Sequence, residues 1–129
     1  MNKICTTIEQ SKKLSEILPI ESADMMWDDW SLIDEGWRSI VGYYPEIEKD
    51  YGRKCYPAWS LVALLDQLED VIVDENGYNY QLQIIKEGVQ YYLVYEGVDD
   101  FASYDTSLFD DLVDACVEMI LKLKEKDLL

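Results

Sequence analysis

The chain has 129 residues, of which 11 are lysine or arginine, 27 are aspartate or glutamate and none is histidine, giving a formal net charge of −16 at pH 7. This charge disfavours direct binding to nucleic acid or to an anionic membrane, and the lack of histidine excludes catalytic triads built on an imidazole base. A hydrophobic content of 49% supports a folded core, and the length predicts one domain over residues 1–129.

The cysteines and the N-terminus indicate the compartment. Cys5, Cys55 and Cys116 are odd in number, far apart and never in a C-x-x-C pair, which favours a reducing environment. The first residues lack the apolar segment of a secretion signal, and no apolar run reaches membrane-spanning length. We therefore expect a cytoplasmic protein without a membrane partner.

The N-terminal region predicts a helix over residues 7–18 and then a short strand. Thr6 and Glu9 stand at the spacing of a capping box, and Pro19 is expected to end the helix. The short apolar run at residues 25–27 predicts an extra strand.

Residues 30–56 form an irregular segment rich in aromatic residues. Such a long stretch without clear periodicity is uncommon unless it is functional or mobile. One hypothesis is that the Trp/Tyr-rich segment 27–59 binds a small ligand or a carbohydrate, and the alternative is that its aromatic residues anchor the core. The candidate ligand-binding side chains are Trp30, Trp37, Tyr43 and Tyr44.

The middle of the chain predicts a helix, a short strand and a β-hairpin. Residues 60–70 carry four leucines at helical spacing, and residues 71–73 predict a further short strand. Residues 78–96 alternate as two strand-forming runs, and Gly88 supplies the positive φ of the turn between them. The second run carries bulky side chains on both faces and is expected to be the more central strand.

A final amphipathic helix is predicted over residues 107–126. Residues 105–107 offer side-chain oxygens for its N-terminus, and lysines in its last turns suit the helix dipole. The predicted fold is α+β, a small antiparallel sheet built on the hairpin with the three helices packed mainly on one face. The expected apolar stripe of the final helix comprises Leu108, Leu112, Ala115, Cys116, Met119 and Leu123.

The acidic residues of this last helix suggest a surface for a partner protein. Fourteen acidic residues and one basic residue, Lys86, lie between Cys55 and Leu121. The chain is therefore interpreted as an acidic, non-catalytic interaction or regulatory module whose unknown partner is expected to be basic. Two other hypotheses are a nucleic-acid-mimicking inhibitor of a basic protein and a merely solubilising face. The candidate partner surface is Asp110, Asp111, Asp114, Val117, Glu118 and Leu121.

No catalytic or cofactor site is predicted. The cysteine spacings do not form a zinc site, and the acids around Gly77 do not fit a calcium-binding loop. Paired carboxylates near the tryptophans at residues 28–35 leave glycoside hydrolysis as a remote alternative. We expect no enzyme activity, no metal and no cofactor.

Four short blocks are spread over nearly the whole chain, at residues 5–14, at residues 22–25, at residues 57–61 with 63–65, and at residues 115–119. They resemble a family of small uncharacterised proteins from Bacteroides-type gut bacteria and their phages or mobile elements. The resemblance implies a bacterial or phage cytoplasmic protein, and it carries over neither an activity nor functional residues.

Overall fold

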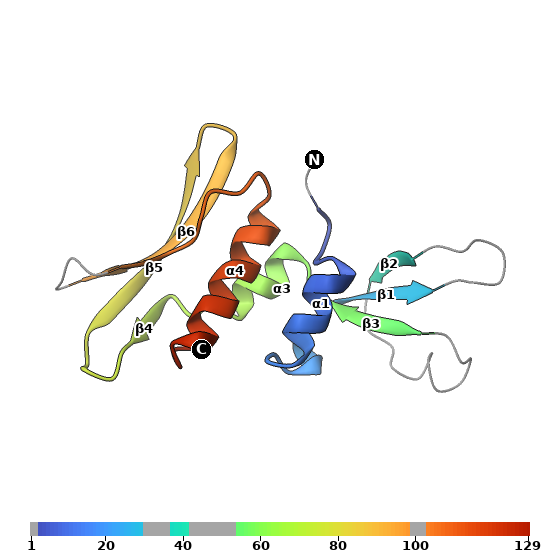
Figure 1. Ribbon diagram of the computed structural model, residues 1–129, viewed down its shortest axis with the longest axis horizontal. Coiled ribbons are helices and arrows are strands. Elements are labelled where there is room, and N and C mark those ends of the chain that lie inside the picture. Colours follow the sequence, from blue (N-terminus) through green and yellow to red (C-terminus); the bar gives the residue numbers. More distant parts are fainter. Residues whose placement is uncertain (1–2, 30–36, 42–53, 99–102) are drawn as a thin grey trace. The chain divides into compact units, whose positions relative to one another are not determined.

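The computed structural model describes residues 3–29, 37–41, 54–98 and 103–129. Within these ranges the chain combines helices with two antiparallel sheets, which confirms the predicted α+β class (Figure 1). The length predicted a single domain, whereas the contacts group the chain into two compact units. We call Ile4–Ala63 the N-terminal unit, and Leu64–Leu129 together with Met1–Lys3 the C-terminal unit.

In the described ranges, the N-terminal unit combines helices with a three-stranded antiparallel sheet. Its elements there are α1 (Ile8–Ser15), the 3-10 helix η1 (Ile20–Ser22), β1 (Met25–Asp29), β2 (Trp37–Val41) and β3 (Cys55–Ala58). The strands lie in the order β2-β1-β3, and α1 contacts β3. The strand predicted at residues 25–27 is therefore present, at the centre of this sheet.

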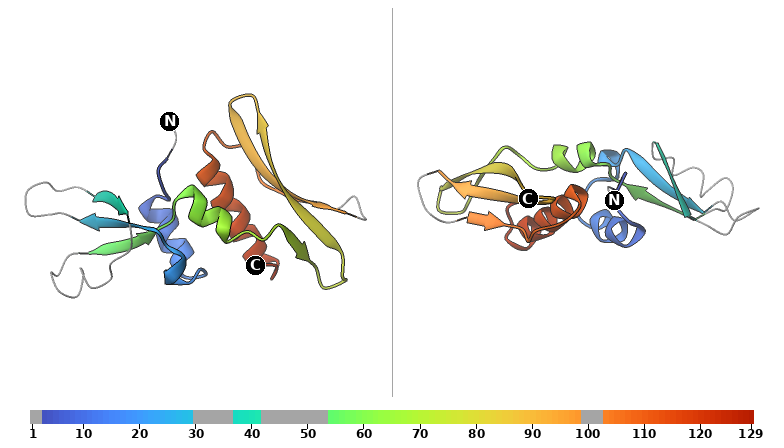
Figure 2. Two further views of the ribbon diagram at one scale, coloured as in Figure 1. Left: turned by 180° about the vertical axis from the view of Figure 1, so that it is seen from behind. Right: turned by 90° about the horizontal axis from the view of Figure 1, so that it is seen from above.

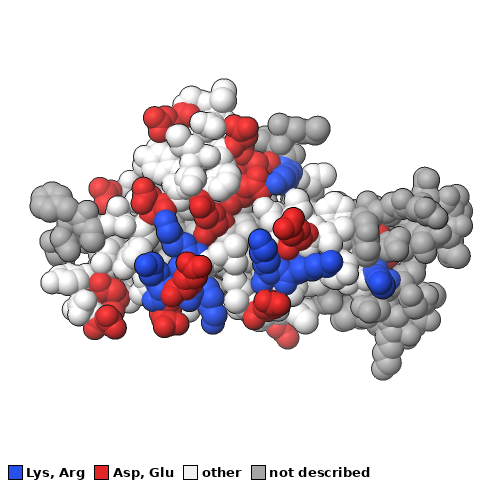
Figure 3. Space-filling model, viewed as in Figure 1, with Lys and Arg blue, Asp and Glu red and all other residues white. Residues whose placement is uncertain are grey.

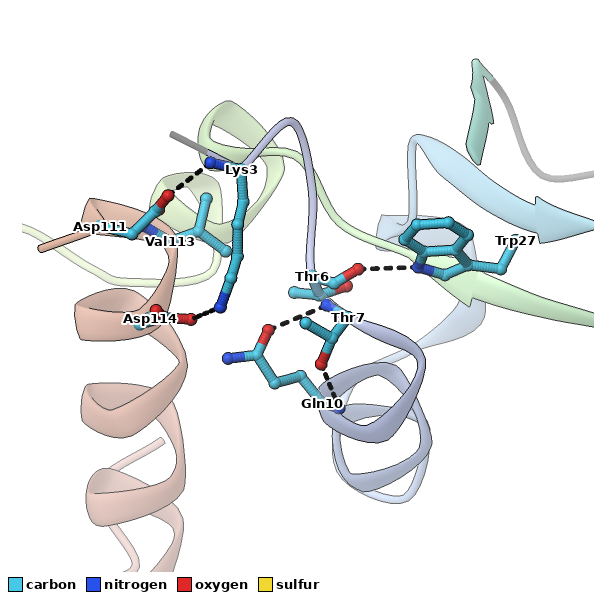
Figure 4. Close-up of polar contacts among 8 residues, drawn as sticks. All are labelled: Lys3, Thr6, Thr7, Gln10, Trp27, Asp111, Val113 and Asp114. Atoms are coloured by element: carbon cyan, nitrogen blue, oxygen red, sulfur yellow. Dashed lines mark hydrogen bonds and ion pairs between the residues drawn. The ribbon is translucent and has the colours of Figure 1, made fainter. Parts of the chain in front are cut away.

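The capping box of α1 lies one residue later than predicted. Thr7 is the N-cap, because its Oγ1 accepts the Gln10 amide at 3.1 Å while Gln10 Oε1 accepts the Thr7 amide at 2.9 Å (Figure 4). Thr6 is buried, and its amide donates to the Trp59 carbonyl at 3.0 Å. Its hydroxyl lies 2.8 Å from Ser11 Oγ. Thr6 is thus used in a tertiary contact, and the helix starts after it.

The described part of the C-terminal unit is a four-stranded antiparallel sheet with a long helix. Its elements are β4 (Val71–Val73), β5 (Asn79–Glu87), β6 (Gln90–Gly97), β7 (Ser103–Asp105) and α4 (Leu112–Glu125). The strand order is β4-β5-β6-β7, so the predicted hairpin and the strand at residues 71–73 are confirmed. The helix predicted at residues 60–70 is the shorter α3 (Leu61–Asp66), which leads along the chain from one unit into the other.

The hairpin turn is made by Gly88 and Val89. The register pairs Glu87 with Gln90, which leaves two residues in the loop, and Gly88 has a φ of +64°. A glycine with positive φ at the first loop position is typical of the type II′ turn, whose twist suits a two-residue hairpin. The predicted turn glycine is therefore confirmed.

α4 covers one face of this sheet and contacts β6 (Figure 2). Leu93 and Tyr95 of β6 are completely buried, and the Tyr95 hydroxyl donates to the Glu69 carbonyl at 2.6 Å. Burying a large apolar side chain stabilises a fold by about 1.5–3 kcal/mol, so the contact between α4 and β6 stabilises this unit. The buried side chains of α4 are Val113, Ala115, Cys116, Val117, Met119, Ile120 and Leu123.

The predicted start of the last helix at residue 107 is wrong, because residues 103–109 continue along β6 instead. The Thr106 amide donates to the Leu93 carbonyl at 2.9 Å, and Phe109 and Tyr91 exchange hydrogen bonds of 2.7 and 2.9 Å. The expected core residue Leu108 precedes the helix and is 45% exposed. The expectation that all helices favour one face of a single sheet is also wrong, because α1 packs on β3 of the other sheet.

Candidate interaction surface

The acidic surface predicted on the last helix is not a uniformly exposed face. Asp111 and Val117 are only 5% and 4% exposed. Asp111 is the N-cap of α4, where its Oδ1 accepts the Val113 amide at 2.8 Å. Asp110 is exposed and accepts a hydrogen bond of 3.2 Å from Gln90 Nε2.

Lys3 occupies part of this acidic side. The Lys3 amide donates to the Asp111 carboxylate, and Lys3 Nζ lies 2.5 Å from Asp114 Oδ1 (Figure 4). The Lys3 and Asp114 side chains are 36% and 21% exposed. Asp114 therefore neutralises a lysine of the same unit rather than standing free in solvent.

Two further charged side chains of α4 hold the segment that leads into it. Glu118 accepts the Ser107 amide at 2.9 Å, and Lys122 Nζ donates to the Asp105 carbonyl at 2.5 Å. Leu121, the last member of the predicted surface, is half-buried. Figure 3 shows lysine side chains gathered over the C-terminal part of α4, among acidic ones. The internal roles of these carboxylates weaken the idea that α4 imitates the phosphates of a nucleic acid.

A different surface of the C-terminal unit exposes apolar side chains. The hairpin extends beyond the N-terminal end of α4 in Figures 1 and 2. We call residues 84–92 at this end the hairpin arm. Val89 at its tip is 82% exposed and Ile84 is 47% exposed, while Ile85, Tyr91 and Tyr92 are half-buried. The alternating pattern of the sequence places these residues in the hairpin but does not mark them as a surface.

The backbone amide and carbonyl groups of successive β5 residues point alternately to the side of β4 and to β6. The Leu82 amide donates to the Asp70 carbonyl at 2.8 Å, so the peptide groups of even-numbered residues point to the side of β4. Glu87 and Gln90 close the two-residue turn, so those of odd-numbered residues point to β6. Ile85 therefore bonds to β6, whereas the amide and carbonyl of Ile84 point away from it.

The outer edge of β5 is open along the hairpin arm. Pairing with β4 covers only its first residues, with Val71 opposite Gln81 as the last pair in that direction. Beyond it, the outward amide and carbonyl groups of Ile84 and Lys86 pair with no strand in the described ranges. Unpaired strand edges are the sites at which another chain adds a strand.

Charged residues stand along this open edge. Asp70 lies where β4 begins, Glu87 lies next to the turn, and both are exposed. Lys86, the only base between Cys55 and Leu121, stands between them in β5 and is exposed too. A lysine on an edge strand discourages indiscriminate sheet association.

Three of the four predicted ligand-binding aromatic residues, Trp30, Tyr43 and Tyr44, lie outside the described residues. The fourth, Trp37, is placed only through the backbone pairing of β2 with β1. Two other tryptophans of the segment have structural roles. Trp27 Nε1 donates to the Thr6 carbonyl at 2.8 Å, and the completely buried Trp59 donates to Ser22 Oγ at 2.8 Å.

A cavity of about 480 Å³ lies in the C-terminal unit between the β4–β5 turn and the end of α4. Desolvation raises the pKa of Asp74 in its wall, but hydrogen bonds from Tyr78, Tyr80 and Asn76 outweigh it and hold this pKa below its ordinary value. Asp74 thus fixes the turn. The cavity is lined by Val73, Asp74, Glu75, Asn76, Tyr104, Lys126, Asp127 and Leu128.

The other perturbed groups are buried structural ones. Burial, reinforced by Asp111, raises the pKa of the Cys116 thiol to about 12, so this cysteine is a poor nucleophile. Burial also raises the pKa of Tyr95, with contributions from Glu69 and Asp70. In the part of the chain that the structure describes, no three cysteine or carboxylate side chains form a group able to hold a metal ion.

The chain matches no protein-family model, no curated protein and no solved structure. The resemblance to the Bacteroides-type family therefore stays a prediction. None of the helices in the described ranges combines the length and apolar character needed to cross a bilayer.

Proposed function

We propose that this chain is a non-catalytic protein-interaction or regulatory module that contacts its partner through the hairpin arm. The observation that supports this function is the exposure of Val89 and Ile84 on an arm that extends past α4. Exposed apolar side chains grouped with tyrosines and rimmed by polar residues are typical of protein contact surfaces. The setting that we propose is the cytoplasm of a bacterium or a phage-infected cell.

The net charge of −16 favours a basic partner, because opposite charge speeds the encounter and disfavours acidic competitors. The proposed contact surface differs from the one expected on α4, because Asp111, Asp114 and Glu118 already bind groups of their own unit. We therefore propose the hairpin arm, and not α4, as the surface that contacts the partner.

Site-specific photo-crosslinking tests this function. A benzophenone amino acid is placed at Val89, or at the exposed control position Lys124 on α4, in chains incubated with a lysate of the organism that encodes them. We expect a discrete crosslinked protein from position 89 that is absent from position 124 and is reduced by Ile84→Asp. Identical crosslinks from the two positions, or none from position 89, would contradict the proposed function.

A further inference from the structure

The open edge of β5 offers the groups that an added strand requires. Ile84 and Lys86 each direct one amide donor and one carbonyl acceptor outward, two residues apart, as in a regular ladder. The side chains of Ile84 and Lys86 lie on one face of the sheet, and the side chain of Ile85 lies on the other. A strand laid along this edge would therefore gain main-chain hydrogen bonds and apolar contacts on both of its faces.

We propose that the outer edge of β5 at residues 83–87 binds an extended, basic segment of a partner protein as an added β-strand. This inference rests on the proposed function and specifies how the hairpin arm binds. The main-chain hydrogen bonds supply affinity for any extended chain, and Ile84 and Ile85 select apolar or β-branched residues at alternating positions.

Charge complementarity selects the basic segment as the occupant, because carboxylates stand at both ends of this edge and a single base, Lys86, stands between them. The free edge lies between Asp70, which directly precedes β4 and is the last residue bonded to this side of β5, and Glu87 beside the turn. Basic residues near both ends of the added strand would approach these carboxylates. A second copy of the chain is disfavoured, because it carries another net charge of −16.

A short peptide of alternating valine and threonine with a lysine at each end is the probe. It is titrated into the wild-type protein while the amide resonances of Ile84, Ile85 and Lys86 are followed by NMR. We expect the peptide to slow hydrogen exchange at the outward amides of Ile84 and Lys86 and to leave the amide of Ile85, already bonded to β6, nearly unchanged. Absence of binding, or slowing confined to other strands, would overturn the proposal.

Proline variants at the outward-facing residues separate the contribution of backbone pairing to peptide binding from that of side-chain contacts. Ile84→Pro removes an amide that β6 does not use, so the hairpin ladder is retained. Ile84→Thr keeps the amide and is the matched control. We expect peptide affinity to fall by about tenfold or more in Ile84→Pro and by about threefold or less in Ile84→Thr. Lys86→Pro, with Lys86→Thr as its control, repeats the test at the second outward amide, and equal affinities within both pairs would overturn the proposal.

Two further measurements test which kind of chain binds to this edge. The same peptide with glutamate at both ends should bind at least about tenfold more weakly, and the advantage of the lysine peptide should shrink at high salt. Equal affinity for the two peptides would overturn the basic character of the segment. A stable dimer that Ile84→Pro dissociates would identify a second copy as the occupant and would also overturn the proposal.

The crosslink at position 89 distinguishes this inference from the proposed function. If the crosslink persists at full yield in Ile84→Pro, strand addition is wrong and the interaction function stands. If it is lost in Ile84→Pro and kept in Ile84→Thr, both are supported. If the peptide binds at the edge but position 89 crosslinks to no protein, the edge accepts strands and the proposed function is wrong.

Discussion

Asp111 Oδ1 accepts a 2.8 Å hydrogen bond from the amide of Val113, two residues further along the chain. This bond satisfies one of the amides that the first turn of α4 leaves without a helical acceptor. A residue placed by its sequence on an outward acidic face is therefore a buried cap.

Replacing this cap should destabilise the protein far more than replacing its neighbour. We expect Asp111→Ala to lower the free energy of unfolding by about 1–2 kcal/mol, because the Val113 amide and the Lys3 amide both lose their acceptor. The exposed Asp110 is the control, and Asp110→Ala should change the free energy of unfolding by less than about 0.5 kcal/mol. Urea titration measures both, and equal losses would contradict the assigned cap.

Thr106 holds the segment before α4 onto β6 through its side chain. Its Oγ1 accepts the Leu93 amide at 3.0 Å and donates to the Ser107 carbonyl at 2.9 Å. Thr106→Val keeps the shape but leaves the buried amide without an acceptor, so we expect a loss of about 1–3 kcal/mol. Thr106→Ser keeps the hydroxyl and should lose less. Thermal unfolding of the pair measures the difference, and a serine variant as unstable as the valine variant would contradict this role.

Met119 and Leu108 were both expected in the apolar stripe of the last helix. Met119 is completely buried, whereas Leu108 is 45% exposed. Met119→Ala should lower the free energy of unfolding by about 2–5 kcal/mol, since it leaves a cavity at a completely buried position. Leu108→Ala should lower it by less than about 1 kcal/mol. Chemical denaturation compares the two, and a larger loss for Leu108→Ala would show that α4 does not pack as described.

The stability of the protein should fall in alkaline solution. Burial, with a contribution from Asp111, raises the pKa of Cys116 from 9.0 to about 12 in the folded state. Between these values the unfolded chain releases the thiol proton and the folded chain keeps it. The contribution of this group to stability is therefore complete below pH 9 and is lost as the pH rises toward 12, by at most about 1.4 kcal/mol per pH unit.

Urea titrations between pH 8 and about pH 10 measure this slope. Cys116→Ala removes the titrating thiol, so its stability should decline less steeply over the same range, whatever its stability at neutral pH. Tyr95 also has a raised pKa, and it contributes in both proteins once the unfolded tyrosine ionises. Parallel pH profiles for the wild type and Cys116→Ala would contradict the assigned shift.

The sequence predicts those parts of the fold that depend on local periodicity. The alternation at residues 78–96 and the helical spacing of Ala115, Cys116 and Met119 reflect which side chains face the core, and both are confirmed. Gly88 is recognisable because few other residues adopt a positive φ. These signals require no knowledge of distant contacts.

Element ends and charged contacts depend on partners that spacing does not reveal. Thr106 has the chemistry of a helix cap, but pairing with Leu93 uses it in the sheet. Asp114 looks like a solvated carboxylate until Lys3, over a hundred residues away, is placed beside it. The sequence does not reveal the open edge of β5 either, because this edge exists only since the pairing with β4 ends at Gln81.

Hydrogen exchange of the free protein tests the open edge of β5 most directly. The amides of Gln83 and Ile85 point to β6 and should be protected, whereas those of Ile84 and Lys86 should exchange at least about tenfold faster. Alternation of fast and slow amides along this strand is the predicted result. Equal protection of all four amides would show that the edge is already covered, and the proposed binding surface would have to be abandoned.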